Sequence, residues 1–402
     1  MKMRLGVTAA VAALLMASGA AAQSRAPGLA PMTNSLEAGL WSSSDRMERS
    51  ARASAELNVD ADLNAYVREV MCSIANEYCP EVRVYVLDRQ VFNATAAPNG
   101  YIEVWSGLLL RAQSDAELAF VLGHEITHYA ENHTFEQFNT YKTYNTIAMV
   151  VSLGAGLAGA YYGIDLSSVG DLAYFTAMSA YFGYNRGQET EADTLGLRRA
   201  AEAGYDPAAG AAIWRALQAE TAASTFPSVR RSEAANSLFR THPLTADRIE
   251  ALAQHGIVLA DSSTPVRSAD RQRHRSAIRP FLGQWLEEEL LRRDFGGLLT
   301  VIDRLDDEAE DLGVLGFYRG EVFRQRRGDG DLEKARTAYL AAVEHVDVPV
   351  AAWRELGDVQ HKLGDHAAAR AAWSRYLAAA PPDADDRWIV EDSLKSLETP
   401  DA

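Results

Sequence analysis

The sequence of 402 residues predicts a mainly helical α+β domain with one small β-sheet, followed by an all-helical domain of repeats. Three patterns support this fold class. Apolar residues follow Ser114 at a helical spacing, polar and apolar residues alternate from Tyr101 to Trp105, and small and aromatic residues recur near the C-terminus at a fixed interval. The length of the chain also allows two domains.

Residues 1–22 have the composition of a cleavable secretory signal peptide. Lys2 and Arg4 precede an apolar run from Leu5 to Met16, and three alanines end at Ala22. A membrane anchor is the alternative, but the run is short for that role. Cleavage after Ala22 removes two positive charges and no negative ones, which changes the formal net charge from −16 to −18. We therefore expect an exported, acidic chain for which nucleic acid is a poor partner.

Cys72 and Cys79 are the two cysteines of the sequence, and their presence in an exported chain indicates a disulfide. In an uninterrupted helix, seven residues would separate them by about 10 Å, too far for a bridge. If they pair, the helix that contains Val67 to Ile74 should therefore end near Asn76. Zinc binding by the two thiols is the alternative.

A β-hairpin is predicted between Asn93 and Leu109. Pro98-Asn99-Gly100 has the composition of a turn, and the alternating residues after it indicate a strand. Such a strand could bind an extended peptide by edge addition. An ordinary structural hairpin explains the same pattern.

The segment from His124 to His128 has the spacing of a metal site. A helix advances about 100° per residue, so the two histidines lie one above the other, roughly 6 Å apart, and can share an ion. Glu125 lies beside this face, where it could take a proton from metal-bound water. Ser114 as N-cap, with Glu117 three residues later, predicts the start of the helix. Two surface histidines without a metal are the alternative.

A catalytic zinc ion has three protein ligands and an open position for water, so one ligand must come from elsewhere. The position six residues after His128 holds Thr134 rather than a third histidine. His133 lies about 180° around the helix from His124, which predicts a supporting role rather than ligation. Glu131 falls on the ligand face but would have to reach back along the helix axis, so we disfavour it.

The charged run from Asn185 to Asp193 is a better place to look for the third ligand, and it contains the motif Arg-x-x-Glu-x-x-Ala-Asp. Together with the earlier His-Glu-Ile-Thr-His, this motif resembles the HtpX-like and CAAX-prenyl-protease-like family of zinc metalloproteases. Without that resemblance, an acidic helix face with an internal arginine is typically solvated.

The resemblance implies a zincin-type protease domain that binds one zinc ion. Its ligands would be His124, His128 and Glu189, and Asp193, one turn after Glu189, would be the partner of a ligating histidine. Glu191 is expected to point elsewhere.

Two further segments match the same family. Asn93 to Leu109 resembles its strand-turn-strand segment, with Asn99 in place of a glycine. Thr241 to Ile249 resembles its His-Pro segment, in which an arginine follows six residues after the histidine. These residues approach the metal in the family, which makes His242 and Arg248 candidates to stabilise the tetrahedral oxyanion. His242 could instead occupy the open zinc position at rest, and without the resemblance a His-Pro pair before a helix is a common junction.

The chemistry follows from the metal. Zinc lowers the pKa of its bound water toward 7, Glu125 accepts the proton, and the hydroxide attacks a peptide carbonyl. Glu125 then returns the proton to the leaving amine. A structural zinc site is normally closed by four protein ligands and does not need such a glutamate, so we expect a metalloendopeptidase acting on proteins or peptides. A chaperone or scaffold with a latent or structural zinc site is the alternative.

Residues 147–182 are almost wholly apolar, apart from an interruption at 163–170. The first apolar run, Ile147 to Tyr162, is shorter than the roughly 20 residues of a membrane span. We expect a helical hairpin packed against the protein. Peripheral membrane contact, or a lid over the zinc cleft, is the alternative.

A polar stretch without a hydrophobic period predicts a linker at residues 261–278. It would separate a protease domain at 23–260 from a helical domain at 279–396.

The helical domain has the interval of a tetratricopeptide repeat. Ala335 and Tyr339 stand thirty-four positions before Ala369 and Trp373. A degenerate earlier pair is expected from Phe281 to Leu305, although a generic helical hairpin explains that pair equally well.

The export signal, the metalloprotease motifs and the C-terminal repeats are together similar to the periplasmic BepA-like branch of the family. That branch is associated with quality control of outer-membrane proteins. The resemblance implies a periplasmic location, misfolded or stalled envelope proteins as substrates, and repeats that recruit substrate or outer-membrane assembly proteins. The repeat region of this sequence is shorter than is common in that branch.

Overall fold

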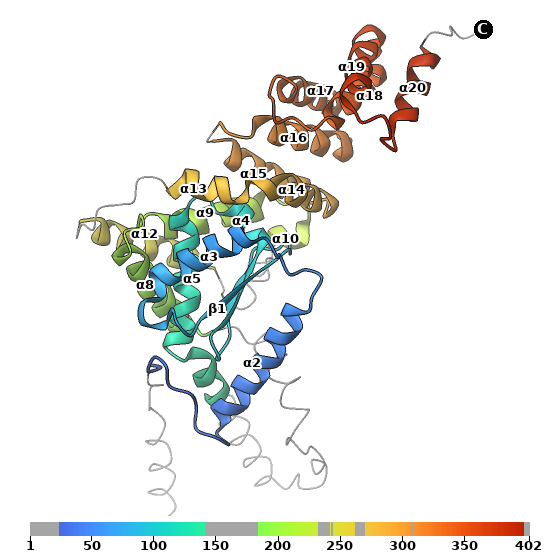
Figure 1. Ribbon diagram of the computed structural model, residues 1–402. Helices are drawn as coiled ribbons and strands as arrows, with labels where there is room; N and C mark the ends of the chain where they lie inside the picture. The colour runs from blue at the N-terminus through green and yellow to red at the C-terminus, as the bar shows by residue number, and fades with distance from the viewer. Residues whose placement is uncertain are drawn as a thin grey trace, which may run out of the picture.

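The computed structural model describes most of the chain as helices around one small sheet, with a stack of helical pairs at the C-terminal end (Figure 1). This architecture confirms the predicted fold class. The predicted signal peptide and the apolar stretch 147–182 lie outside the described residues. The described residues are 24–140, 184–231, 242, 244–261, 270–307 and 309–397.

The sheet has three strands in the order β1-β3-β2. β1 (Arg83–Leu87) runs parallel to β3 (Tyr101–Trp105), and β2 (Ala94–Ala96) runs antiparallel to β3 and forms an edge. The turn before β3 contains Gly100, whose φ of 82° is one that glycine adopts without strain. The predicted hairpin is therefore confirmed.

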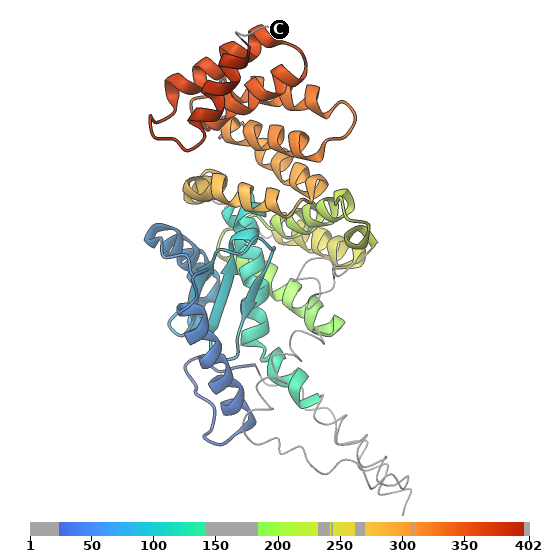
Figure 2. The same cartoon turned by 90° about the vertical axis from the view of Figure 1, so that its right-hand side faces the viewer.

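The sheet lies between helices of different character (Figure 2). α3 (Ala61–Ala75) and α5 (Asp115–Ala130) cover the apolar face, where Ile102 and Val104 are fully buried. α2 (Leu36–Arg52) covers the polar face, where its Glu48 binds Arg83 at 2.6 Å. The alternation along β3 thus separates a hydrophobic core from a layer of ion pairs.

α3 ends at Ala75, as the cysteine spacing requires. Asn76 has a φ of 51°, and this left-handed residue turns the chain into a short 3₁₀ helix, Asn76–Tyr78. The turn brings Cys72 and Cys79 together as a disulfide with Cα atoms 4.8 Å apart.

α5 runs through the middle of the protease part, and every one of its residues is buried. Ser114 caps its first turn, accepting from Glu117 N at 3.2 Å, as predicted. α8 (Arg186–Glu202) packs against it through two glycines: a Cβ at Gly196 would lie 2.6 Å from His124 N and 2.7 Å from the carbonyl carbon of Gly123. The two helices therefore approach closely only because neither residue has a side chain.

The second half of the predicted linker differs from the prediction. α13 (Asp270–Ile278) is a helix packed on α3 and α5, and its His274 is 1 % exposed. The His274 Nε2–H donates to the carbonyl oxygen of Leu109 at 2.9 Å, and Nδ1 lies 2.8 Å from the Tyr66 hydroxyl. Because α13 packs partly through hydrogen bonds, its sequence has no hydrophobic period, and this polar stretch therefore predicts a linker instead of a helix.

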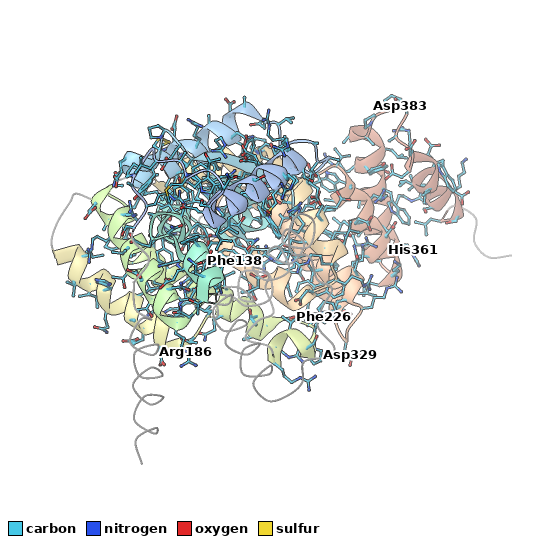
Figure 3. All side chains as sticks on the ribbon, turned by 90° about the horizontal axis from the view of Figure 1, so that it is seen from below. Phe138, Arg186, Phe226, Asp329, His361 and Asp383 are labelled. Atoms are coloured by element: carbon cyan, nitrogen blue, oxygen red, sulfur yellow. A yellow bond between two sulfur atoms is a disulfide. The ribbon has the colours of Figure 1, made fainter. Side chains whose placement is uncertain are left out.

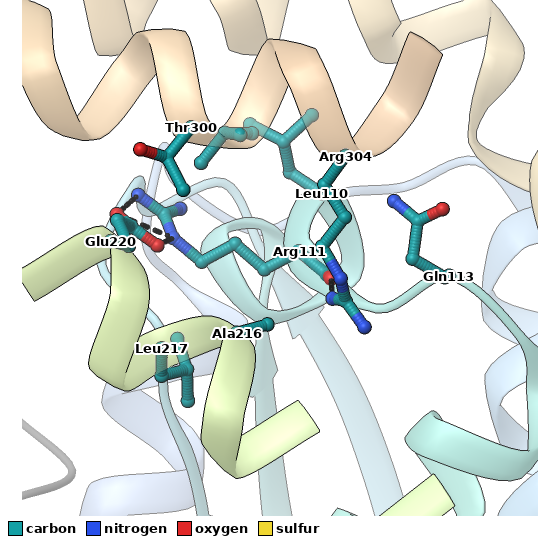
Figure 4. Close-up of a pocket in the computed structure, with 9 residues that line it drawn as sticks. Leu110, Arg111, Gln113, Ala216, Leu217, Glu220, Thr300 and Arg304 are labelled. Carbon is teal, nitrogen blue, oxygen red and sulfur yellow. Dashed lines mark hydrogen bonds and ion pairs between the residues drawn. The ribbon is translucent and has the colours of Figure 1, made fainter. Parts of the chain in front are cut away.

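The first helical pair, α14 (Leu282–Leu291) and α15 (Phe295–Asp306), is attached to the protease part by largely buried ion pairs and hydrogen bonds around Arg111 (Figure 4). Arg111, at the end of α4 (Ser106–Arg111), has its Nε and Nη2 at 2.8 and 2.7 Å from the carboxylate of Glu220. Its Nη1 lies 2.8 Å from Glu289 on α14. Arg304 on α15 donates to the Arg111 carbonyl oxygen and to Glu117.

Later helices form two pairs and a final helix, and each pair uses a glycine under an aromatic ring. Gly320 lies against the ring of Tyr339, and Gly357 lies in the same way against Trp373. The helices are α16 (Leu312–Arg326), α17 (Asp331–Ala342), α18 (Ala351–Lys362), α19 (His366–Ala379) and α20 (Arg387–Ser396). Viewed from below, His361 of α18 and the loop residues Asp329 and Asp383 lie on one side of the molecule, and Arg186 lies on the opposite side (Figure 3).

The described part also contains α9 (Ala209–Ala223), α10 (Pro227–Arg231), α12 (Ala246–Asp261), the short 3₁₀ helix Arg279–Phe281 and a helical segment at 133–140. Among the described residues, no helix combines the length and the apolar character needed to cross a membrane.

Candidate metal centre

Four side chains from three parts of the chain converge inside the protease part. His124 and His128 come from α5, Glu189 from the first turn of α8, and His242 from the segment before α12. One nitrogen or oxygen atom of each lies within 4.8 Å of the others, and all four residues are buried. The structure thus brings together the three ligands expected from the sequence and adds the histidine that was left open between two roles.

The separations of these atoms suit a single small ion. His124 Nε2 lies 3.1 Å from His128 Nε2 and 3.0 Å from His242 Nδ1. Glu189 Oε1 lies 3.6 Å from His128 Nε2 and 2.8 Å from His242 Nδ1. Ligands at 2.0–2.2 Å around a tetrahedral zinc ion are about 3.3 Å apart, so this donor set of imidazoles and one carboxylate fits Zn²⁺.

His124 is held from behind by a carboxylate. Its Nδ1 lies 3.0 Å from Asp193 Oδ1, as the resemblance implied. Asp193 in turn binds Arg248. Burial alone would raise the pKa of Asp193, but the hydrogen bonds from His124 and Arg248 outweigh it and hold that pKa below its usual value. The carboxylate stays ionised and fixes the ring with Nε2 toward the centre.

His128 is held from behind by a second histidine. Its Nδ1 lies 2.9 Å from His133 Nδ1, and His133 Nε2 lies 3.3 Å from Glu191. Tyr184 stacks on the other side of the His128 ring, with centroids 3.7 Å apart. Burial lowers the pKa of His128, which favours the neutral form that binds a metal.

Glu125 points into the same region but stands apart from the four convergent atoms. It is 2 % exposed, and its Oε1 lies 3.8 Å from His242 Nε2 and accepts no hydrogen bond from the described residues. Burial raises its pKa, with His242 and His124 acting in the opposite sense. A buried glutamate with a raised pKa and a free oxygen is suited to accept a proton from a neighbouring water.

Arg248 has a different environment from the one expected of an oxyanion donor. Its Nη1 lies 2.7 Å from Glu189 Oε2, and its Nε and Nη2 contact both oxygens of Asp193. The geometry places this guanidinium where it orients the carboxylates of the centre.

Two supporting features could not be assigned from the sequence. Glu191 was expected to point elsewhere; it does lie away from the ligand atoms, but it contacts His133. Tyr184 follows the apolar stretch and carries no motif of its own. A ligating histidine needs a partner for its outward ring nitrogen; for His128 that partner is His133, and Glu191 in turn is the partner of His133.

Comparison with known proteins matches the same part of the chain. Residues 58–255 match a sequence model described as Peptidase family M48. A beta-barrel assembly-enhancing protease of Yersinia pestis is 29% identical over 174 residues, which are 40% of this chain and 34% of that protein. A protein of the same name from Escherichia coli is 24% identical over 211 residues, 51% of this chain and 41% of that protein.

A third relative comes from an organelle. Mitochondrial metalloendopeptidase OMA1 of Arabidopsis thaliana is 30% identical over 178 residues, 44% of this chain and 32% of that protein. In each case the match spans less than half of the relative's length.

Proposed function

Residues 58–255 belong to peptidase family M48, and from this premise we propose that the chain is a zinc-dependent endopeptidase of the bacterial cell envelope. The observation that carries the proposal is the convergence of His124, His128 and Glu189 beside a buried Glu125 with a free oxygen. A structural site has no use for such a glutamate.

His124, His128 and Glu189 would hold the ion, one per chain. When bound, zinc supplies Lewis acidity toward water and toward a peptide carbonyl. Glu125 is the general base: it accepts a proton from the attacking water and returns it to the leaving amine. Asp193 and Arg248 keep His124 and Glu189 oriented while this occurs.

His242 has two roles open to it. As a fourth ligand it would close the centre at rest; displaced by substrate, it would stabilise the negative charge that develops on the carbonyl oxygen. Its Nδ1 lies 2.8 Å from Glu189 and its Nε2 lies 3.8 Å from Glu125, so a ring rotation separates the two roles.

The substrate class we propose is misfolded or stalled envelope protein. An extended segment would add to the edge strand β2, whose Ala96 backbone N–H donates to Glu125. The helical pairs with tetratricopeptide-like spacing would recruit substrate or outer-membrane assembly proteins, in keeping with the names of the Yersinia and Escherichia relatives.

Periplasmic location is part of the proposal. It rests on the sequence features of a signal peptide at 1–22 and on the disulfide between Cys72 and Cys79, a bond that is typical of oxidising compartments.

The alternative is a chaperone or scaffold of envelope assembly with a structural or latent zinc site. One observation favours it: with His242 included, the centre has four protein ligands, the number typical of a closed structural site.

Glu125→Gln separates the two functions. The variant should bind one zinc ion per chain like the native protein and lose cleavage of an unfolded protein such as casein by about 10²- to 10⁴-fold. Glu131→Gln, a nearby change outside the centre, is the matched control and should keep full activity. Cleavage that survives in purified Glu125→Gln protein would refute the assigned base, and native protein that binds zinc without cleaving would favour the scaffold.

A further inference from the structure

The proposed function gives no role to His133, whose ring lies behind that of His128. His133 is 2 % exposed, its ring centroid lies 5.0 Å from that of His128, and it takes no place among the convergent ligand atoms. We propose that His133, backed by Glu191, is a positioning residue that fixes the tautomer and orientation of His128 for metal binding. The inference rests on the proposed zinc site and adds a support to it.

The direction of the hydrogen bonds follows from the outer end of this chain of contacts. A carboxylate only accepts, so His133 Nε2, at 3.3 Å from Glu191, carries the hydrogen. A neutral His133 then has a lone pair on Nδ1, which accepts from His128 Nδ1 at 2.9 Å. His128 therefore carries its hydrogen on Nδ1 and presents the Nε2 lone pair to the centre. An acid two rings away selects the tautomer that a metal requires.

Backbone geometry explains how His133 reaches this position. α5 ends at Ala130, and Asn132 has a φ of 57°, a left-handed conformation that asparagine tolerates well. The helix is interrupted at residues 131–132, and a second helical segment begins at His133. The helical geometry that predicts His133 on the far side from His124 therefore ends three residues before His133, and the interruption lets its ring contact His128.

The same turn is attached to the helix that provides the third ligand. Gln188, the residue before Glu189, donates from Nε2 to Glu136 at 2.9 Å and lies 3.5 Å from the His133 carbonyl oxygen. The turn is thereby fixed relative to the first turn of α8.

The two ligating histidines differ in their support. Asp193, behind His124, is 4 % exposed and is bound by Arg248, whereas the Glu191 side chain behind His133 is 51 % exposed. Water can replace an exposed acceptor. We therefore expect His133 to matter more than Glu191.

The test measures the zinc affinity of the full chain by competition with a chromogenic chelator, together with the visible spectrum of the Co²⁺-loaded protein. His133→Leu removes the acceptor and should weaken zinc binding by about 10- to 100-fold. His133→Asn places an amide oxygen near the position of Nδ1 and should restore affinity to within about threefold of native. Glu191→Leu should reduce the zinc affinity only a few-fold. His255→Asn, a control substitution of a histidine on α12, should leave the zinc affinity unchanged.

Thermal unfolding of the metal-free proteins separates positioning from general stability. The metal-free His133→Leu and His133→Asn proteins should unfold at similar temperatures, while zinc raises the unfolding temperature less in His133→Leu. The inference is overturned if His133→Leu binds zinc and Co²⁺ like the native protein, or if His133→Asn is as weak as His133→Leu. Native protein that binds no zinc at all would refute the proposed function instead, so the two failures are distinguishable.

Discussion

The guanidinium of Arg248 contacts both carboxylate oxygens of Asp193, with Nε and Nη2 at 2.7 and 2.8 Å. Its third nitrogen lies 2.7 Å from Glu189. One fixed cation therefore compensates two buried carboxylates, and the three groups together carry a formal charge of −1. Two neutral imidazoles leave this charge unchanged, which suits the centre to a divalent cation.

Arg248→Leu should destabilise the metal-free protein strongly, because it leaves two buried carboxylates without their cation. We expect a loss of about 3 to 5 kcal/mol in the free energy of unfolding. Saturating zinc should recover part of this loss, since the ion supplies positive charge to Glu189. Urea unfolding with and without zinc measures both quantities. Arg248→Lys keeps the positive charge but loses the planar guanidinium, so its stability should lie between that of the native protein and that of Arg248→Leu. Equal stability of the native protein and both variants would show that these contacts contribute little.

Gly196→Ala should weaken the centre without touching a ligand. A Cβ there would meet the backbone of Gly123 and His124 at 2.6–2.7 Å, so α8 must move away from α5 and carry Glu189 with it. We expect a loss of about 1 to 3 kcal/mol in stability, together with lower zinc affinity. Gly39→Ala on α2 is the matched control: no atom lies within 4 Å of its added Cβ, so this change should be neutral or slightly stabilising. The two variants behaving alike in thermal unfolding and zinc titration would contradict the close-packing argument.

Helical periodicity was sufficient to predict the first half of the centre. His124, Glu125 and His128 belong to one regular helix, so their mutual geometry follows from their spacing. Glu189 lies 65 positions after His124, and only the resemblance to a family connected the two. Local spacing contains no information on which distant helix packs against α5; the paired glycines 123 and 196 decide that contact, and their complementarity is visible only in three dimensions.

Elements with polar packing were the hardest to predict. α13 buries His274 and Arg275 through hydrogen bonds and an ion pair, and this leaves no apolar stripe in the sequence. His133 was misplaced on the helical wheel for a related reason, since one left-handed residue, Asn132, ends the regular geometry. Hydrophobic patterns in a sequence indicate which residues form the apolar core. α13 and His133 were hard to predict because hydrogen bonds, not apolar contacts, hold them in place.

Removing the disulfide should cost moderate stability. Cys72 and Cys79 close a short loop at the end of α3, for which chain entropy predicts about 2 to 3 kcal/mol. The double variant Cys72→Ser/Cys79→Ser should unfold at lower urea concentration than oxidised native protein. Native protein treated with a reductant should fall to the level of the variant, which itself should not respond. A native protein insensitive to reductant would mean that the bridge does not form in solution.

Acid should destabilise the protein partly through His274. Burial lowers the pKa of this histidine to about 4, from 6.5 in an unfolded chain. Between these values the unfolded state binds more protons than the folded state, so the contribution of His274 is complete above pH 6.5 and is lost as the pH falls toward 4. The full difference of about 2.5 pKa units corresponds to about 3 kcal/mol.

The matched comparison for this effect is His274→Gln, which keeps an amide able to bond Leu109 and Tyr66 but does not titrate in this range. Urea unfolding of both proteins without metal, at intervals from pH 7.5 to 4, gives the difference in their pH dependence and cancels the contribution of every other titrating group. Native protein should lose about 2 kcal/mol more than the variant between pH 7.5 and 5. Parallel curves would mean that His274 takes up its proton in the folded state as readily as in the unfolded chain. In that case the contacts of α13 with α3 and α5 would hold His274 equally well as a neutral imidazole above about pH 6.5 and as a charged one below it.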